Sequence, residues 1–422
     1  MKCLSFIVLL IIFLKGHCVE QYCKINDAEH CKERDEGYKY KKGIYFFLFG
    51  PDKYRICILF FIFSVEKYEE YIEAIHNAER NYIECNATRC ECFKDIVIRD
   101  LKPFKKNGIS KELIDIAKTR GTFYQIISGK LYREKDCMFP SRCAGIEHFL
   151  LKIIHNLTDM DLVVNTRDYP QSNKHFGKPL PVFSFSKTPQ YYDIMYPAWA
   201  FWEGGPAISL YPRGLGRWDQ HRELLNKASE NIPWNKKKEK VFFRGSRTSS
   251  ERDNLILLSR KNPNLVDAQY TKNQAWKSDE DTLHAPPASE VPLESHCAYK
   301  YLFNYRGVAA SFRYKHLFLC RSLVFHVGDE WTEFYYDAMK PWIHFIPVPK
   351  DASQTELKEL IQFAIDNDIL SEKIANRGRD FIWHKLRMKD ILCFWKKLLK
   401  SYGKIFSYKP VLDKHLIKIE RK

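Results

Sequence analysis

The sequence predicts an α/β protein made of two parallel-sheet domains that face a cleft. A chain of 422 residues, 45% of them apolar, is long enough to bury two hydrophobic cores of ordinary size. Short apolar runs alternate with helical patterns in both halves, which is typical of parallel-sheet domains. Two Arg-Gly turns, at 244–245 and 306–307, each follow a strand-like run. Ligands of open α/β sheets bind at the carboxyl ends of such strands.

The N-terminus is predicted to be a secretory signal peptide over residues 1–18. Lys2 precedes an apolar run at 4–14, and Gly16 and Cys18 supply the small residues that cleavage after Cys18 requires. The chain has 13 cysteines, without a Cys-x2-Cys pair matched by histidines, which favours disulfide bonds over a zinc site.

Two N-glycosylation sequons, at Asn86 and Asn156, agree with an oxidising lumen. Between the signal peptide and the first expected helix, residues 19–66 form an atypical insertion. It contains two aromatic-aliphatic runs, and each run is too short to span a bilayer. We assign no function to this insertion.

The net charge of +16 favours an anionic partner. The basic residues are scattered, however, and the chain has no helix-turn-helix, RNA-binding or zinc-finger spacing. Nucleic-acid binding is therefore disfavoured, and an ordinary basic surface is the simpler interpretation.

The first half is predicted to alternate helices and strands. Helices are expected at 66–82, 149–154 and 218–231. Buried strands are expected at 162–164 and 181–185, with a glycine turn at 202–206. Residues 234–238 are interpreted as an interdomain linker.

The second half repeats the alternation, with a loop at 279–291. Strands are predicted at 241–243, 265–267, 300–305, 323–327 and 343–348. Helices are predicted at 254–260, 309–320, 354–367 and 370–401. Both halves are therefore expected to be Rossmann-like domains.

The loop at 244–253 has the features of an anion site. A strand-like run ends at the Arg-Gly turn, hydroxyl and guanidinium groups follow, and a helix begins. Loop donors, bidentate arginine geometry and a helix N-terminus together suit a phosphate. A nucleotide diphosphate fits the charge of this loop better than a single carboxylate. Arg244 and Arg247 are expected only to shape the loop.

The segment 306–313 is a second phosphate candidate. Its small residues would let a ligand approach the amides of a helix N-terminus, and a bound anion would offset Arg313 near the first turn. The alternative is a helix cap with a surface arginine.

Asp168 is the best candidate for a general base. It follows a buried strand, where a carboxylate would face the cleft and accept a proton from an attacking hydroxyl. The alternative is an N-cap or turn aspartate before Pro170. Base and nucleotide would then lie on opposite walls of one cleft, as a transferase needs.

Two aromatic segments remain open between a recognition surface and a structural role. Cys137 and Cys143 bracket a short loop that presents Met, Phe and Arg, and residues 202–211 are rich in aromatics and glycine. Three Asp-x-Asp triplets, at 159–161, 279–281 and 366–368, are interpreted as solvated carboxylates, so no metal is expected.

These segments together resemble the protein O-glucosyltransferases of the Rumi type, in the wider CAP10-like family, over about 68–408. The matching blocks occur in order along the chain. They are Asn165 to Gln171, Phe183 to Lys187, Trp202 to Pro206, Phe243 to Thr248, Tyr270 to Trp276, Arg306 to Arg313 and Phe325 to Trp331.

The resemblance implies a GT-B-like fold of two Rossmann-like domains facing a cleft, with C-terminal helices packing back across. The family moves glucose from UDP-glucose to serine within Cys-x-Ser-x-(Pro/Ala)-Cys of folded EGF-like repeats, as in Notch, and some members use UDP-xylose. The reaction inverts the anomeric carbon and needs no metal. A monomer in the lumen of the endoplasmic reticulum, without stable membrane insertion, is expected.

The resemblance also implies roles for single residues. Asp168 would be the general base. The residues expected to hold UDP-glucose are Tyr211, Ser246, Arg252, Val308, Ala309, Ala310, Ser311, Phe312 and Arg313. Those expected to contact the acceptor are Met138, Phe139, Pro140, Ser141, Arg142, Ala207, Ile208, Ser209, Leu210, Tyr211, Pro212, Gln274 and Tyr301. The implied disulfides are Cys85–Cys92, Cys90–Cys393, Cys137–Cys143 and Cys297–Cys320.

The expected domains are an acceptor-binding domain at 67–233, a nucleotide-sugar-binding domain at 234–385, and a C-terminal helix and tail at 386–422. The sequence departs from the family pattern at its end, where Ile419 to Lys422 replace a Lys-Asp-Glu-Leu-like retention signal. Secretion is therefore the alternative to retention. The alternative functions are a related transferase with another sugar or acceptor, and a non-catalytic luminal protein that binds EGF repeats.

Overall fold

The computed structural model describes residues 47–48, 56–57, 68–85, 88–206, 210–211, 214–272 and 276–420. The chain forms two compact units, residues 1–67 and 68–422. Within the first unit the described residues form two short antiparallel strands, β1 (Phe47–Leu48) and β2 (Ile56–Cys57). The predicted signal peptide lies outside the described residues.

The second unit contains two sheets, and the first of them is mixed. Its six strands have the order β15-β4-β3-β5-β6-β8. Strands β5, β6 and β8 run parallel, whereas β3, β4 and β15 pair antiparallel. The bounds are β3 (Thr122–Ile127), β4 (Lys130–Arg133), β5 (Met160–Val164), β6 (Val182–Ser184), β8 (Ile194–Met195) and β15 (Ile417–Ile419).

The antiparallel part of this sheet corrects the expectation of a purely parallel sheet. Strands β3 and β4 form a hairpin whose turn residues, Ser128 and Gly129, both have positive φ (49° and 68°). Two-residue hairpin turns favour that conformation because its twist matches the strands. Strands β3, β4, β8 and β15 were not predicted from the sequence.

The second sheet is parallel throughout, as predicted, with the order β10-β9-β11-β12-β14. Each of its strands contains or overlaps a predicted strand. The bounds are β9 (Lys238–Gly245), β10 (Val266–Tyr270), β11 (Tyr299–Asn304), β12 (Leu323–Val327) and β14 (Ile346–Val348).

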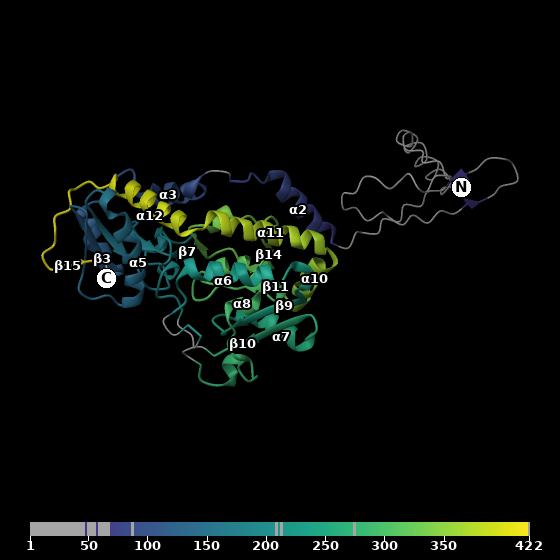
Figure 1. The fold of residues 1–422 in the computed structure, drawn as a ribbon. Coiled ribbons are helices and arrows are strands. Elements are labelled where there is room, and N and C mark those ends of the chain that lie inside the picture. Colours follow the sequence, from purple (N-terminus) through teal and green to yellow (C-terminus); the bar gives the residue numbers. More distant parts are fainter. Residues whose placement is uncertain are drawn as a thin grey trace. The chain divides into compact units, whose positions relative to one another are not determined.

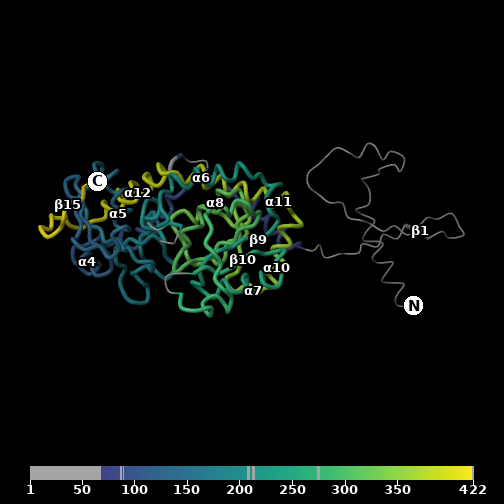
Figure 2. Tube along the Cα trace, turned by 60° about the horizontal axis from the view of Figure 1, so that its bottom comes forward, coloured from purple at the N-terminus to yellow at the C-terminus, as the bar shows by residue number. Residues whose placement is uncertain are grey.

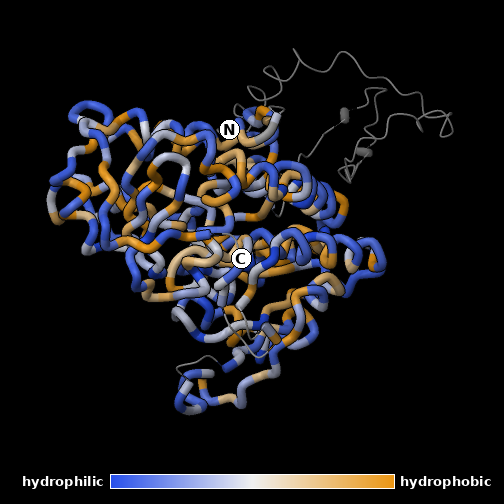
Figure 3. The backbone as a smooth tube through the Cα atoms, turned by 60° about the vertical axis from the view of Figure 1, so that its left-hand side comes forward, coloured by the Kyte–Doolittle hydropathy of each residue, from blue (hydrophilic) through white to orange (hydrophobic). Residues whose placement is uncertain are grey.

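Helices cover both sheets, and the predicted α/β architecture is confirmed. In the first half they are α2 (Glu69–Asn81), α3 (Lys94–Leu101), α4 (Lys111–Ala117), α5 (Pro140–Ile153) and α6 (Trp218–Asn231). In the second half they are α7 (Asp253–Lys261), α8 (Leu293–His296), α9 (Tyr314–Leu319), α10 (Gln354–Asp366), α11 (Asp368–Lys385) and α12 (Met388–Gly403). Figure 3 shows that hydrophobic and hydrophilic residues alternate along these elements, as amphipathic helices require.

The C-terminal helices pack back across the molecule. Helix α11 contacts α9 and β12 of the second half, whereas α12 contacts α3 and α5 of the first half (Figure 1). Figure 2 also shows α12 beside α5 at one end of the unit, with α7 and α10 at the other end. The chain therefore crosses from the second half to the first between α11 and α12.

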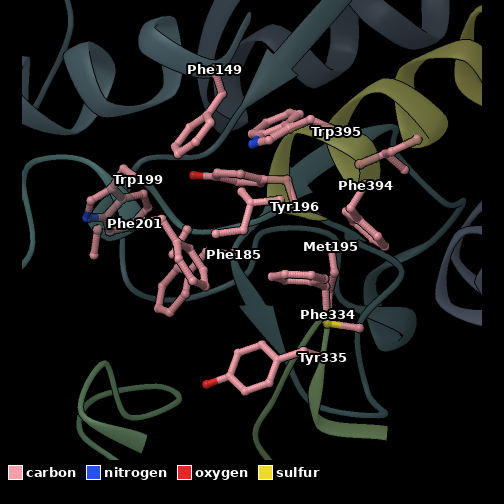
Figure 4. Packing of buried hydrophobic residues seen from close by; sticks show 14 of the residues in the cluster. Phe149, Phe185, Met195, Tyr196, Trp199, Phe201, Phe334, Tyr335, Phe394 and Trp395 are labelled. Carbon is pink, nitrogen blue, oxygen red and sulfur yellow. The ribbon is translucent and has the colours of Figure 1, made fainter. Parts of the chain in front are cut away.

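One hydrophobic core is shared by the two halves. Figure 4 shows Tyr196 and Trp199 of the first half near Phe334 and Tyr335 of the second, with Trp395 of α12 above them. Strands β7 (Ser186–Lys187) and β13 (Thr332–Glu333) add an antiparallel pair between the halves. A second core lies on the other face of the parallel sheet, against α7 and α10.

Three predicted segments differ from the structure. The expected linker 234–238 is packed: Trp234 is buried and donates to Asp368, and buried Lys237 donates to the carbonyl oxygens of Cys297 and Cys320. The helix expected at 309–320 begins only at Tyr314. The long helix expected at 370–401 is two helices, which are separated at Leu386–Arg387.

Four disulfide bonds have the pairing that the family resemblance implies. They are Cys85–Cys92, Cys90–Cys393, Cys137–Cys143 and Cys297–Cys320. Cys90–Cys393 joins residues 303 positions apart and fixes α12 to the first half. The other three close short loops.

We expect loss of the long-range disulfide to destabilise the protein strongly. A Cys90→Ala/Cys393→Ala variant should lose about 5 kcal/mol of unfolding free energy, because closing a long loop restricts the unfolded chain most. The matched Cys85→Ala/Cys92→Ala variant, which opens a seven-residue separation, should lose roughly 2 kcal/mol. Urea denaturation measures both values, and equal losses would contradict the loop-length argument.

Candidate active site

Asp168 lies on a loop that hydrogen bonds hold in one conformation. The loop follows β5, at the carboxyl end of that strand. The Asn165 side chain donates to the carbonyl oxygen of Tyr169 (2.7 Å) and accepts from the amide of Arg167 (2.9 Å). Buried Asp193 accepts from the amides of Gln171 and Ser172, each at 2.7 Å. Asp168 is thereby fixed between two anchored ends of the loop.

The carboxylate of Asp168 is ion-paired and partly open to solvent. Arg142 Nη1 lies 3.0 Å from Asp168 Oδ1, and the Asp168 side chain is 36% exposed. No helix begins at this residue, so the N-cap alternative does not apply. A carboxylate with one oxygen held and one side open has the arrangement that a general base needs.

The two Arg-Gly turns of the sequence meet around Gly245. A Cβ placed on Gly245 would lie 3.0 Å from Arg313 Nη2 and 3.3 Å from Arg252 Nη1. Arg252 donates to the carbonyl oxygens of Ser246 and Arg306, and Arg313 donates to that of Arg244. The absence of a side chain at Gly245 is what lets both guanidinium groups approach the strand end.

Neither of these two arginines has a carboxylate partner in the part of the chain that the structure describes. Burial lowers the pKa of both side chains, and the charge of Arg313 lowers that of Arg252 further. The Nε atom of Arg252 is buried without a hydrogen-bond partner. Two adjacent cations without a compensating charge form a site that favours an anion.

The other arginines of these loops are compensated. Arg244 pairs with Asp267 at 2.8 Å, Arg247 with Asp253 at 2.6 Å, and Arg306 with Glu251 at 2.8 Å. Their charges hold the loop together. This division agrees with the expectation that Arg244 and Arg247 shape the loop.

The run 308–313 leads to the N-terminus of α9 but does not form its first turn, whereas the helix was expected to begin at residue 309. Helix α9 begins after it and has six residues, with Arg313 as its N-cap. Ala309, Ala310 and Ser311 are buried, and the amide of Ala310 donates to Ser186 Oγ at 3.3 Å. The donors that remain for a ligand are therefore backbone amides of a turn and arginine side chains.

Aromatic residues connect this run to the loop of Asp168. The Phe312 ring stacks on Phe185 with centroids 4.9 Å apart and packs against Trp199 at 5.9 Å. The guanidinium of Arg142 lies over the Trp199 ring, 4.6 Å from the ring centroid. The Tyr169 ring of the Asp168 loop meets the Trp331 ring edge-on, with centroids 5.2 Å apart. Arg252 and Arg313 therefore lie on the second half and Asp168 on the first, and these aromatic contacts join the two halves.

A pocket adjoins this run at the carboxyl ends of β11 and β12. The sequence analysis assigned no role to most of its residues, although Phe325 to Trp331 was one of the matching blocks. Polar and aromatic side chains form its wall together with Ala310 and Ser311: Glu251, Arg306, His326, Glu330, Trp331, Tyr336 and Lys350. This pocket lies between the turn 308–313 and the carboxyl ends of β11 and β12.

The residues predicted to contact an acceptor differ in exposure. Met138, Phe139, Pro140 and Ser141 are exposed, and Leu210 is 40% exposed. Tyr211 is half-buried, and its hydroxyl accepts from the amide of Leu293 at 3.2 Å. Five others lie outside the described residues: Ala207, Ile208, Ser209, Pro212 and Gln274.

The structure corrects the assignments of Tyr301 and of one aspartate triplet. Tyr301 lies in the central strand β11, fully buried against Trp234 and Phe325, so its side chain cannot reach an acceptor. Asp161 is not solvated: it is buried in β5 and accepts from Gln125 and Tyr408. No group of three or more potential metal ligands occurs among the residues described.

Of the two sequons, Asn156 is exposed at the end of a short turn after α5, and Asn86 lies outside the described residues. In the same part of the chain, no helix is long and apolar enough to cross a bilayer.

Of the two α/β halves, one carries the open carboxylate of Asp168 and the other an arginine pair that favours an anion. The model of glycosyl transferase family 90 matches residues 85–422. The protein belongs to glycosyl transferase family 90 and is a glycosyltransferase.

Similar proteins are known in animals. The O-glucosyltransferase rumi homolog of Anopheles gambiae is 60% identical over 351 residues, which cover 83% of this chain and 88% of that protein. O-glucosyltransferase rumi of Drosophila melanogaster is 57% identical, with coverages of 82% and 85%. Protein O-glucosyltransferase 1 of Homo sapiens is 57% identical, with coverages of 80% and 86%.

A solved structure with some similarity is that of Anabaena HepE in complex with UDP-glucose. The alignment covers 42% of this chain and 51% of the HepE chain. The TM-score is 0.30 and the identity 11%.

Proposed function

We propose that this protein transfers glucose from UDP-glucose to a serine in folded EGF-like repeats, within Cys-x-Ser-x-(Pro/Ala)-Cys. The arginine pair without a carboxylate partner on one half, together with the open carboxylate of Asp168 on the other, is the observation that carries the proposal. The names of the relatives, at 57–60% identity, support glucose as the sugar and a protein as the acceptor.

In the proposed mechanism, Asp168 accepts the proton of the serine hydroxyl while the serine oxygen forms a bond to C1 of glucose. The bond from C1 to the β-phosphate oxygen breaks, and its electron pair leaves with UDP. One displacement inverts C1. Arg252 and Arg313 stabilise the charge that develops on the departing diphosphate, as preorganised donors do in other transferases. No step requires a metal.

The remaining proposed contacts follow from the family resemblance. Tyr211, Ser246 and the turn 308–313 would surround the donor. Met138 to Ser141, which are exposed beside the Asp168 loop, would meet the EGF repeat. Four disulfides fit a luminal enzyme. We therefore place the protein in the lumen of the endoplasmic reticulum, with Notch-type proteins as clients.

Mass spectrometry of a purified, folded EGF repeat tests the proposal. The repeat is incubated with the protein and with UDP-glucose, UDP-xylose or UDP-galactose. We expect one hexose on the consensus serine from UDP-glucose, and none on a repeat that carries alanine there. A pentose from UDP-xylose would establish a second donor. Transfer from UDP-galactose alone would favour another sugar specificity, and UDP binding without any transfer would favour a non-catalytic protein; either result overturns the proposal.

Gly245 should control the donor site without contributing a side chain. In Gly245→Ala the new methyl group would crowd Arg313 and Arg252, and an off-rotamer side chain costs about 1 kcal/mol, or roughly fivefold in affinity. Calorimetric titration with UDP measures this loss. Gly307→Ala is the matched control, because a Cβ there meets only one atom, at 3.9 Å. Equal affinities of the two variants would contradict the proposed position of the diphosphate.

A further inference from the structure

The guanidinium of Arg142 is engaged inside the protein, although its neighbours in sequence face solvent. One nitrogen, Nη1, donates both to the carbonyl oxygen of Thr166 (2.6 Å) and to Asp168 Oδ1 (3.0 Å). The planar group lies between two aromatic rings, 4.3 Å from the centroid of Phe139 and 4.6 Å from that of Trp199. The Arg142 side chain is 19% exposed.

The backbone that carries Arg142 is held as firmly as its side chain. The Cys137–Cys143 disulfide closes the segment, and α5 begins inside it at Pro140. On its other side lies Gly204, with φ of 77°, where a Cβ would stand 2.8 Å from the amide nitrogen of Arg142. The turn 202–206 therefore packs directly on this segment.

These contacts leave little of Arg142 for an acceptor. An incoming peptide would meet Met138, which is 59% exposed, and the outer face of Phe139. The guanidinium lies beneath that ring and faces the carboxylate. Because Arg142 holds Oδ1, the other oxygen of Asp168 is left to receive a proton.

We propose that Arg142 is a positioning residue for Asp168 and not a contact for the acceptor. It orients the carboxylate so that Oδ2 points to the attacking hydroxyl, and Trp199 and Phe139 keep its plane fixed. This inference rests on the proposed function, because it takes Asp168 as the base.

The proposal predicts an effect on turnover and not on acceptor affinity. Arg142→Ala should lower kcat by about 10²-fold, the usual cost of a misplaced reacting group, with the KM for the EGF repeat within about threefold. Arg142→Lys should recover part of kcat, because a lysine can reach either Asp168 or the carbonyl oxygen of Thr166. A rise in KM at constant kcat would assign Arg142 to the acceptor surface and overturn the proposal.

Hydrolysis of UDP-glucose in the absence of any acceptor gives the sharpest test. Water then takes the place of serine, and Asp168 takes its proton, so a residue that only contacts the acceptor has no effect. We expect Arg142→Ala to slow hydrolysis as much as it slows transfer. It should cause no further loss in an Asp168→Asn background. An additive loss in the double variant would show that Arg142 acts by another route.

Arg133→Ala is the matched structural control. Arg133 forms a comparable ion pair with Glu147, at 2.8 Å with both side chains 14% exposed, in the same half of the molecule. This variant should lose thermal stability but keep kcat. The unmodified protein could hydrolyse UDP-glucose without modifying the EGF repeat, in which case the proposed acceptor is wrong. The hydrolysis rates of the variants would still test the role of Arg142. If the unmodified protein does neither, both inferences fall.

Discussion

Asp168→Asn should reduce glucose transfer by about 10²- to 10⁴-fold, the range that loss of a general base usually costs. The amide keeps the shape of the carboxylate and can still accept from Arg142 through its oxygen, so the loop should keep its conformation. Asn165 and Asp193 hold that loop independently of residue 168. The loss should therefore appear in kcat, with UDP affinity unchanged.

The control for this variant is Asp219→Asn. Asp219 also pairs with an arginine, Arg217 at 2.9 Å, and its side chain is 37% exposed, close to the 36% of Asp168. Steady-state kinetics with an EGF repeat and calorimetry with UDP should separate the two variants. Normal turnover by Asp168→Asn, or an equal loss in Asp219→Asn, would remove Asp168 from the role of base.

Arg313→Met should weaken UDP binding by about 10²-fold, because each hydrogen bond between charged groups contributes roughly 1.5–3 kcal/mol. Most substitutions of buried residues destabilise a protein, but Arg313→Met should not. Arg313 and Arg252 are close together without a carboxylate partner among the described residues, and replacing a buried, uncompensated charge with an apolar chain is often stabilising. We therefore expect the melting temperature without UDP to stay equal or to rise.

Arg247→Met serves as the counterpart, because Arg247 lies in the same loop but forms a bidentate pair with Asp253. This variant should keep most of its UDP affinity and lose stability. Calorimetry and thermal melts, each with and without UDP, measure the two quantities. A large loss of UDP affinity in Arg247→Met with none in Arg313→Met would show that Arg247, and not Arg313, binds UDP.

The sequence predicted the parallel sheet and both arginine loops because these depend on local patterns. A strand that ends at Arg-Gly and is followed by hydroxyl residues can be recognised in the sequence without knowledge of the fold. The hairpin of β3 and β4 was missed, since both strands are nearly continuous apolar or mixed runs without a clear alternation. The family resemblance assigned Tyr301 to the acceptor. Because β11 is covered on both faces, its residue pattern could not show that this side chain is buried.

The direction of Arg142 could not be predicted from its own segment. Its neighbours Met138 and Phe139 are exposed, and nothing local distinguishes it from them. Trp199 and Thr166, which are distant in sequence, determine where the guanidinium lies. Similarly, Arg252 and Arg313 differ from Arg244 and Arg247 only in whether an acidic side chain reaches them in the fold.

The antiparallel pair of β7 and β13, together with the shared core and the Cys90–Cys393 bond, has a thermodynamic consequence. The halves cannot separate without exposing apolar surface that belongs to both. Neither half is therefore an autonomous folding unit, and residues 68–422 should unfold cooperatively. A destabilising substitution in either half then lowers the population of the whole catalytic unit, even where it lies far from Asp168 or the arginine pair.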